Sequence, residues 1–174
     1  ETAENPQNVE FLTFHGAPDA PPVDVLARGV GNIVTNLAFA EFDDDYLAVA
    51  PAVYDLDITP AGQNDTVVAS FRADLSGAAG TSLLVAASGF LAPDSGDPGF
   101  GLLAVFPDGT TALLPELDGT SRLQVIHNSP YAAAAEVDVY LNNQLVLDNF
   151  AFRDATPFID VPEGTNVIDV TLPN

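Results

Sequence analysis

The chain has 174 residues, 47% of them apolar, which suits one domain or two small domains built around a buried core. Its formal net charge is −21, because 25 acidic residues are balanced by only four arginines and no lysine. A surface this acidic repels nucleic-acid phosphates, so we expect no nucleic-acid binding. No apolar run approaches the roughly 20 residues that cross a bilayer, so we expect no membrane insertion.

Short β-strands are predicted along the whole chain, after an extended N-terminal segment at residues 1–8. In each candidate strand, apolar and polar residues alternate, or β-branched and aromatic residues run together. The candidates are, in chain order, VEFLTFH (9–15), VDVLA (23–27), YDLDIT (54–59), TVVASFRADL (66–75), TSLLVAAS (81–88), FGLLAVF (100–106), TALLPEL (111–117), RLQVIH (122–127), VDVYL (137–141) and NVIDVT (166–171). Asn142 and Asn143 are predicted to form a hairpin turn, since asparagine tolerates positive φ.

Prolines and glycines spread evenly between these strands argue against long helices. The alanine run at residues 132–135 is therefore predicted to be loop. Short strands separated by turns are typical of an all-β sandwich or barrel, and the alternation favours antiparallel pairing.

The chain contains two internal repeats, at about residues 9–118 and 121–174. Landmarks recur in the same order at an offset of 112 to 114 residues. The matched landmarks are His15 with His127, Pro18 with Pro130, Val23-Asp24-Val25 with Val137-Asp138-Val139, Asn36 with Asn149, and Phe39 with Phe152. So many ordered matches indicate two copies of one module.

The second repeat has no counterpart of residues 61–118. A sandwich that lacks its last strands exposes an open sheet edge and an uncovered apolar face. Three explanations remain open: the natural chain continues past Asn174, the first repeat covers the half-domain, or strands from another molecule complete it.

With these segments laid out, the chain resembles the family called domain of unknown function 4397. The family pattern is a strand ending in His-x-Ser-Pro-Asp-Ala-Pro, followed by Val-Asp-Val-Tyr, a short hairpin and a Pro-x-Gly turn. The first repeat departs from it at Leu26, which replaces the tyrosine, and the second departs at Tyr131. The resemblance implies exported, immunoglobulin-like antiparallel β-sandwiches in tandem on prokaryotic cell surfaces. It implies no reaction and no catalytic residues.

The two histidines of the chain, His15 and His127, each end a predicted strand before a proline-bearing loop. One interpretation is a metal ligand or a general base. The other is structural: the imidazole hydrogen-bonds the loop backbone or the aspartate of the same repeat. A zinc site would need further ligands, and the sequence holds no third histidine and no cysteine, so the structural interpretation is favoured.

Asp24 and Asp138 are each the one polar residue of an apolar strand. They are predicted either to face solvent or to pair with the histidine of the same repeat. Catalytic use would need a second carboxylate or a nucleophile at a defined distance, and the sequence indicates neither. No Gly-x-Ser-x-Gly nucleophile elbow is present. We therefore expect no catalytic residues.

Two loops have the oxygen-rich composition of calcium sites. The stronger candidate is Asp94, Ser95 and Asp97, and the weaker one is the run of aspartates at residues 43–45; neither has EF-hand spacing. Asn64 begins an Asn-Asp-Thr sequence, which is an N-glycosylation acceptor pattern. No cofactor is expected apart from this possible calcium ion.

These observations predict a non-enzymatic extracellular structural protein. The chain begins at Glu1 and contains no methionine, which indicates a mature exported protein whose signal peptide has been removed. It would form a cell-surface layer or filament as a homopolymer, with the N-terminal residues 1–14 adding a β-strand to a neighbour's open edge. The alternative is a ligand- or calcium-dependent adhesion module of a larger surface protein.

Overall fold

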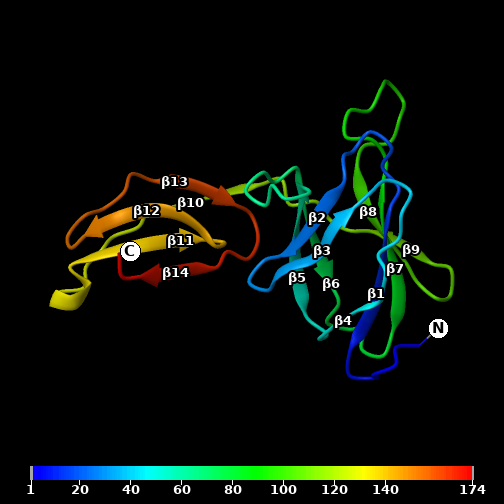
Figure 1. The fold of residues 1–174 in the computed structure, drawn as a ribbon, viewed down its shortest axis with the longest axis horizontal. Coiled ribbons are helices and arrows are strands. Elements are labelled where there is room, and N and C mark those ends of the chain that lie inside the picture. Colours follow the sequence, from blue (N-terminus) through cyan, green and yellow to red (C-terminus); the bar gives the residue numbers. More distant parts are fainter. Residues whose placement is uncertain (1, 174) are drawn as a thin grey trace. The chain divides into compact units, whose positions relative to one another are not determined.

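The structure is a computed structural model that describes residues 2–173 (Figure 1). It consists of two compact units, the first ending at Glu116 and the second beginning at Leu117. No helix among the described residues is long and apolar enough to cross a membrane.

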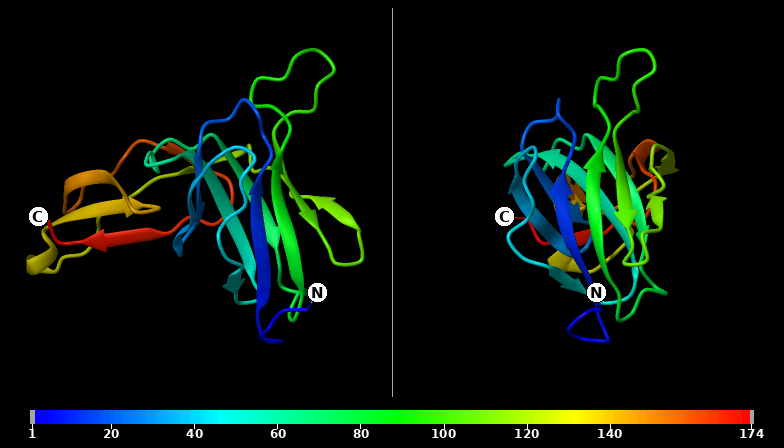
Figure 2. Two further views of the ribbon diagram at one scale, coloured as in Figure 1. Left: turned by 45° about the vertical axis from the view of Figure 1, so that its right-hand side comes forward. Right: turned by 90° about the vertical axis from the view of Figure 1, so that its right-hand side faces the viewer.

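The first unit is a sandwich of two β-sheets, which the views of Figure 2 show from two further sides. One sheet has the order β4-β1-β7-β8-β9 and the other the order β3-β2-β5-β6. The strands are β1 (Val9–His15), β2 (Val23–Ala27), β3 (Gly31–Leu37), β4 (Leu47–Val49), β5 (Val53–Pro60), β6 (Ala69–Asp74), β7 (Ser82–Ser88), β8 (Gly101–Val105) and β9 (Thr111–Leu113). The predicted all-β sandwich class is confirmed.

One pairing in this unit is parallel, which the predicted antiparallel pattern does not include. β1 pairs with β7 over six residues in parallel, whereas the other strand pairs of the unit are antiparallel. Parallel neighbours need a long crossover connection, and here the chain between β1 and β7 contributes most of its strands to the opposite sheet. β1 thereby becomes an inner strand rather than an edge.

The N-terminal residues differ from the prediction of a free, extended donor segment. Residues 2–8 fold back on the first unit through a turn, in which the Asn8 N–H donates to the Asn5 carbonyl at 3.0 Å, and through a bond from the Ala3 N–H to the Gly80 carbonyl at 3.1 Å. Residues 9–14 belong to β1, where Val9 is fully buried. The same apolar alternation that suggested a donor strand instead fixes this segment in its own sheet.

The second unit contains two smaller sheets, one of order β10-β13 and one of order β12-β11-β14. Its elements are β10 (Thr120–Leu123), the short 3-10 helix η1 (Ala132–Ala134), β11 (Glu136–Leu141), β12 (Gln144–Ala151), β13 (Ile159–Pro162) and β14 (Ile168–Thr171). The predicted hairpin turn is present, with Asn142 and Asn143 at φ 49° and 69°. The alanine run, predicted as loop, forms η1.

The strands of the second unit correspond to β1–β5 of the first in order and pairing. Val25 pairs with Ile58 on β5, and Val139, its counterpart in the repeat, pairs with Val170 on β14. Among residues 117–173 no strand corresponds to β6, β7, β8 or β9. The second unit is therefore built like the first five strands of a sandwich whose remaining four are absent from it.

Candidate functional site

Each repeat opens with a histidine that holds a loop together. His15, at the end of β1, is fully buried, and its Nε2 lies 3.0 Å from the Pro21 carbonyl oxygen. Its Nδ1 accepts the Ala17 N–H at 3.3 Å, so the pattern requires the tautomer that carries its proton on Nε2. Both ring nitrogens are occupied, which leaves neither of them for a metal ion or for proton abstraction.

The second repeat has the same arrangement. His127 is buried, its Nε2 lies 2.8 Å from the Ala134 carbonyl oxygen, and its Nδ1 accepts the Ser129 N–H at 3.4 Å. In both repeats the bonds go to loop backbone and not to the aspartate. Pro18 and Pro130 are exposed in these loops. This is the arrangement that the structural interpretation of the histidines describes.

Asp24 and Asp138 are buried, which differs from the expectation of a solvent-facing or histidine-paired carboxylate. Asp24 accepts the N–H of Asn36 at 2.7 Å and the N–H of Gly62 at 2.9 Å. Asp138 accepts the N–H of Asn149, the counterpart of Asn36, at 2.9 Å.

These carboxylates satisfy a β-bulge. The registers of β2 against β3 and of β11 against β12 shift beside the aspartate, and Asn36 and Asn149 adopt φ 54° and 51°. The bulge turns the asparagine N–H out of the strand ladder, and a carboxylate one strand away accepts it. The sequence signal for this feature is the matched pair Asn36 and Asn149. It shows that the position recurs in both repeats, but not that the asparagine N–H bonds to the aspartate.

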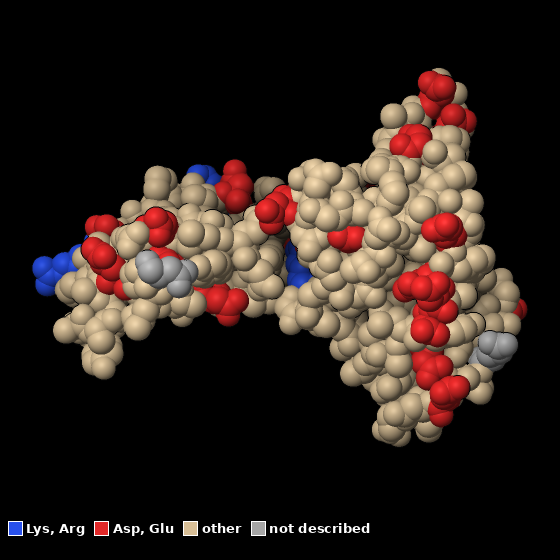
Figure 3. Space-filling view, viewed as in Figure 1, with Lys and Arg blue, Asp and Glu red and all other residues tan. Residues whose placement is uncertain are grey.

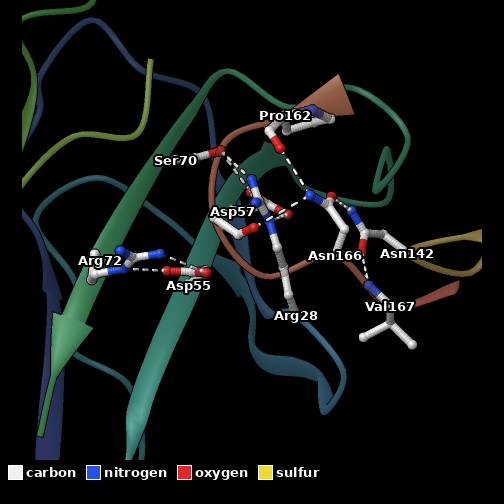
Figure 4. Close-up of polar contacts among 10 residues, drawn as sticks. Arg28, Asp55, Asp57, Ser70, Arg72, Asn142, Pro162, Asn166 and Val167 are labelled. Carbon is white, nitrogen blue, oxygen red and sulfur yellow. Dashed lines mark hydrogen bonds and ion pairs between the residues drawn. The ribbon is translucent and has the colours of Figure 1, made fainter. Parts of the chain in front are cut away.

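The acidic face of β5 is neutralised by the first unit's own arginines. The buried Arg28 forms an ion pair with Asp57, with 2.7 Å between Nη2 and Oδ1, and also donates to the Ser70 hydroxyl at 3.1 Å. Arg72 lies beside Asp55, with 2.9 Å between Nε and Oδ1 (Figure 4). In the second unit, by contrast, the Arg122 side chain is largely exposed, 3.5 Å from the exposed carboxylate of Asp160. Carboxylates are spread over both units on the face that Figure 3 shows.

Within residues 2–173, no strand pairs with the outer side of β14, which we call the open edge along β14. In the first unit the corresponding strand β5 pairs with β6, and the Ile58 carbonyl accepts the Val68 N–H on that side. Just before β14 begins, the carbonyl of Val167 points toward the β11 side, because it accepts the Asn142 N–H at 2.8 Å. Since backbone groups alternate along a strand, Ile168 and Val170 direct their N–H and C=O groups away from β11.

The apolar side chains of this strand are uncovered as well. Val170 is 60% exposed and Ile168 is 52% exposed, whereas their counterparts Ile58 and Leu56 are 3% and 6% exposed. The strand itself is held firmly: Asn142 Oδ1 accepts the Val167 N–H at 2.9 Å just before β14 begins (Figure 4). An ordered strand with unpaired backbone groups and exposed apolar side chains is a template for strand addition.

A second open edge runs along β10. Its counterpart β1 pairs with β7 in the first unit, and the Glu10 N–H donates to the Thr81 carbonyl on that side at 3.0 Å. Arg122, Gln124 and Ile126 correspond to Glu10, Leu12 and Phe14, and their backbone groups face the open side by the same alternation. Ile126 is 61% exposed.

Sequence comparison agrees with this architecture. A family profile described as a domain of unknown function, DUF4397, matches residues 10–135 and again residues 121–174. The chain belongs to the DUF4397 family. The second DUF4397 match is partial and covers the unit with the open edges. Searches of curated proteins and of solved structures found no match.

The structure places the calcium and glycosylation candidates of this DUF4397 chain in exposed turns. Asp94, Ser95 and Asp97 lie in one turn, closed by a bond from the Asp97 N–H to the Asp94 carbonyl at 3.0 Å. Among residues 2–173 no three His, Cys, Asp or Glu side chains gather as metal ligands. The Asn64 side-chain amide donates to Asn32 at 3.1 Å. Calcium binding and glycosylation of this DUF4397 protein remain predictions.

Proposed function

We propose that the protein is a non-enzymatic extracellular structural protein that assembles with other copies of itself by β-strand addition to the second unit. The observation that supports this proposal is the contrast between the two units. β1 and β5 are each covered by a further strand in the first unit, and β10 and β14 are not covered by any strand among the described residues.

The first unit specifies the form of the missing strands. A strand added beside β10 would run parallel to it, as β7 runs beside β1. A strand added beside β14 would run antiparallel to it, as β6 runs beside β5. Each would form main-chain hydrogen bonds and cover apolar side chains, which is how strand-addition complexes combine affinity with specificity.

Charge favours head-to-tail assembly over pairing of like units. The first unit's arginines form close ion pairs with its own buried carboxylates, whereas Arg122 of the second unit is exposed on the open edge in a looser pair with Asp160, at 3.5 Å. An acidic first unit of another copy therefore meets a cation at this edge. A heterologous contact of this kind produces rings or open filaments rather than closed dimers.

Salt dependence follows from the net charge of −21. Copies repel one another at low ionic strength, and about 1 M salt shortens the screening distance to roughly 3 Å. Assembly should therefore increase with salt. Light scattering after size exclusion and negative-stain electron microscopy, with and without calcium, measure this directly.

A backbone variant tests the open edge itself. Val170→Pro removes an N–H that faces away from β11, so the second unit keeps its internal ladder while strand addition is blocked. Val170→Thr is the matched control, because it keeps both the N–H and the β-branched shape. We expect polymers from wild type and Val170→Thr and monomers from Val170→Pro, with unchanged circular dichroism.

Two results would overturn the proposal. One is a wild-type protein that stays monomeric at every salt and calcium concentration. The other is a Val170→Pro variant that assembles as wild type does. If assembly instead requires calcium and a different surface protein, the adhesion-module alternative replaces the structural polymer.

A further inference from the structure

A cavity of about 450 Å³ lies between the two sheets of the first unit. Its lining comes from both sheets and is mostly apolar. Examples are Phe11 on β1, Val25 on β2, Leu56 on β5, Val85 on β7 and Leu102 on β8. In a close-packed sandwich this space is filled by interdigitating side chains.

The larger cluster of buried apolar side chains in the first unit joins the two sheets, because Leu102 of β8 packs in it with Leu56 and Ile58 of β5. A smaller cluster contains Phe11 and Leu83, and Ile33 of the other sheet packs against it. Val85 belongs to neither set of fully buried residues, although it faces the opposite sheet and packs against both clusters. The sheets therefore touch around the cavity, and Val85 lines the space that remains between them.

The lining is chemically selective. It contains no lysine or arginine, and Asp74 is its one carboxylate. Thr13 also lines the cavity and is only 8% exposed, and its Oγ1 has no hydrogen-bond partner in the described part of the chain. A buried hydroxyl without a partner is costly, so a ligand that supplies one would be stabilised. An anionic headgroup would therefore have no lysine or arginine in the lining to pair with.

The size suits a ligand rather than trapped water. An engineered apolar cavity of about 150 Å³ stays dry and binds benzene, and typical ligand pockets measure about 300–1,000 Å³. We propose that the first unit binds one neutral, mainly hydrocarbon molecule that carries a single hydroxyl or carbonyl group. This site is independent of the open edges, which lie in the second unit.

The full-length chain tests the site with the neutral dye Nile red. We expect 1-decanol to displace the dye at a single site, and decanoate, which has the same chain length but an anionic end, to bind at least about tenfold more weakly because the buried charge stays unpaired. On binding, the methyl NMR signals of Val85 and Leu56 should shift. A failure of 1-decanol to displace Nile red, or equal affinity for decanoate, would overturn the proposal.

Two substitutions test whether the space between the sheets is open to a ligand. Ala87→Leu projects into the cavity, whereas Ala86→Leu, the matched control, lies on the opposite face of β7. We expect Ala87→Leu to weaken 1-decanol binding about tenfold, without lowering the melting temperature. Ala86→Leu should leave the affinity unchanged. If the space were already filled, Ala87→Leu would lower the melting temperature by overpacking and refute the cavity.

Thr13→Val tests the polar end of the ligand. The substitution keeps the side-chain shape and removes the hydroxyl, so 1-decanol should lose its advantage over decane while decane binds as before. If 1-decanol keeps that advantage, Thr13 is not the ligand's hydrogen-bond partner and this part of the proposal fails.

Discussion

Replacing Asp24 with alanine should destabilise the first unit severely, because the carboxylate holds two backbone N–H groups from distant segments. It accepts from Asn36 at 2.7 Å and from Gly62 at 2.9 Å, and it is buried. The substitution leaves both N–H groups without their carboxylate acceptor, in bonds that are half-buried although Asn36 and Gly62 themselves are exposed. At about 1–3 kcal/mol for each of the two unsatisfied groups, the free energy of unfolding should fall by roughly 2–6 kcal/mol.

Two further variants give this prediction an internal scale. Asp24→Asn keeps one acceptor oxygen, so it should lose about half as much stability. In the second unit Asp138→Ala orphans the Asn149 N–H, for which a loss of about 1–3 kcal/mol is expected. Asp44→Ala, at an exposed site, removes the same formal charge and serves as the control.

Urea unfolding followed by far-ultraviolet circular dichroism measures these losses, and amide hydrogen exchange locates them. In Asp24→Ala the amides of Asn36 and Gly62 should exchange faster before the rest of the unit does. If Asp24→Ala is destabilised by less than about 1 kcal/mol relative to Asp44→Ala, the carboxylate does not support the bulge and the reasoning is refuted.

Three other predictions concern single residues of the first unit. His15→Ala removes a fully buried ring that bonds Ala17 and Pro21, and should cost about 3 kcal/mol in urea unfolding, with the greatest gain in exchange at Ala17. The N–H groups of Ala92 and Leu91 lower the pKa of Asp19 from its ordinary value of 3.8. The two hydrogen bonds to the Asp19 carboxylate are fully formed above pH 3.8 and are lost as pH falls through the lowered pKa. Both amide NMR signals should therefore titrate in acid, and they should not do so in Asp19→Ala. Asn36→Val places a β-branched residue at φ 54° and should lower the melting temperature clearly, whereas Asn36→Gly should not.

Local patterns predicted the strands well, because alternation and turn residues are properties of neighbouring positions. The Val-Asp-Val segments are strands in both repeats, and the Asn142-Asn143 turn is present. The side chain of Asp24, however, was expected to face solvent or the histidine. Its true partners lie 12 and 38 positions away in the chain, and such distant bonds leave no mark in the alternation around the aspartate.

Long-range pairing explains the other differences. The apolar segment at residues 9–14 fits a donor strand and an inner strand equally well. Its parallel neighbour β7 lies about 70 residues further along the chain, where no local rule connects the two. The open edges of the second unit were predictable because the repeat supplied a reference. The cavity was not, since it depends on the spacing between two sheets.

The parallel pair of β1 and β7 has a consequence for the newly synthesised chain. Until β7 emerges, β1 presents the same bare side that β10 presents in the second unit. A newly synthesised first unit therefore has, for a time, an unpaired side of β1 to which another strand can add. Parallel pairings between distant segments form slowly, which prolongs this stage. Neighbouring nascent chains could then capture one another too early. Closure by β7 within the same chain ends that interval.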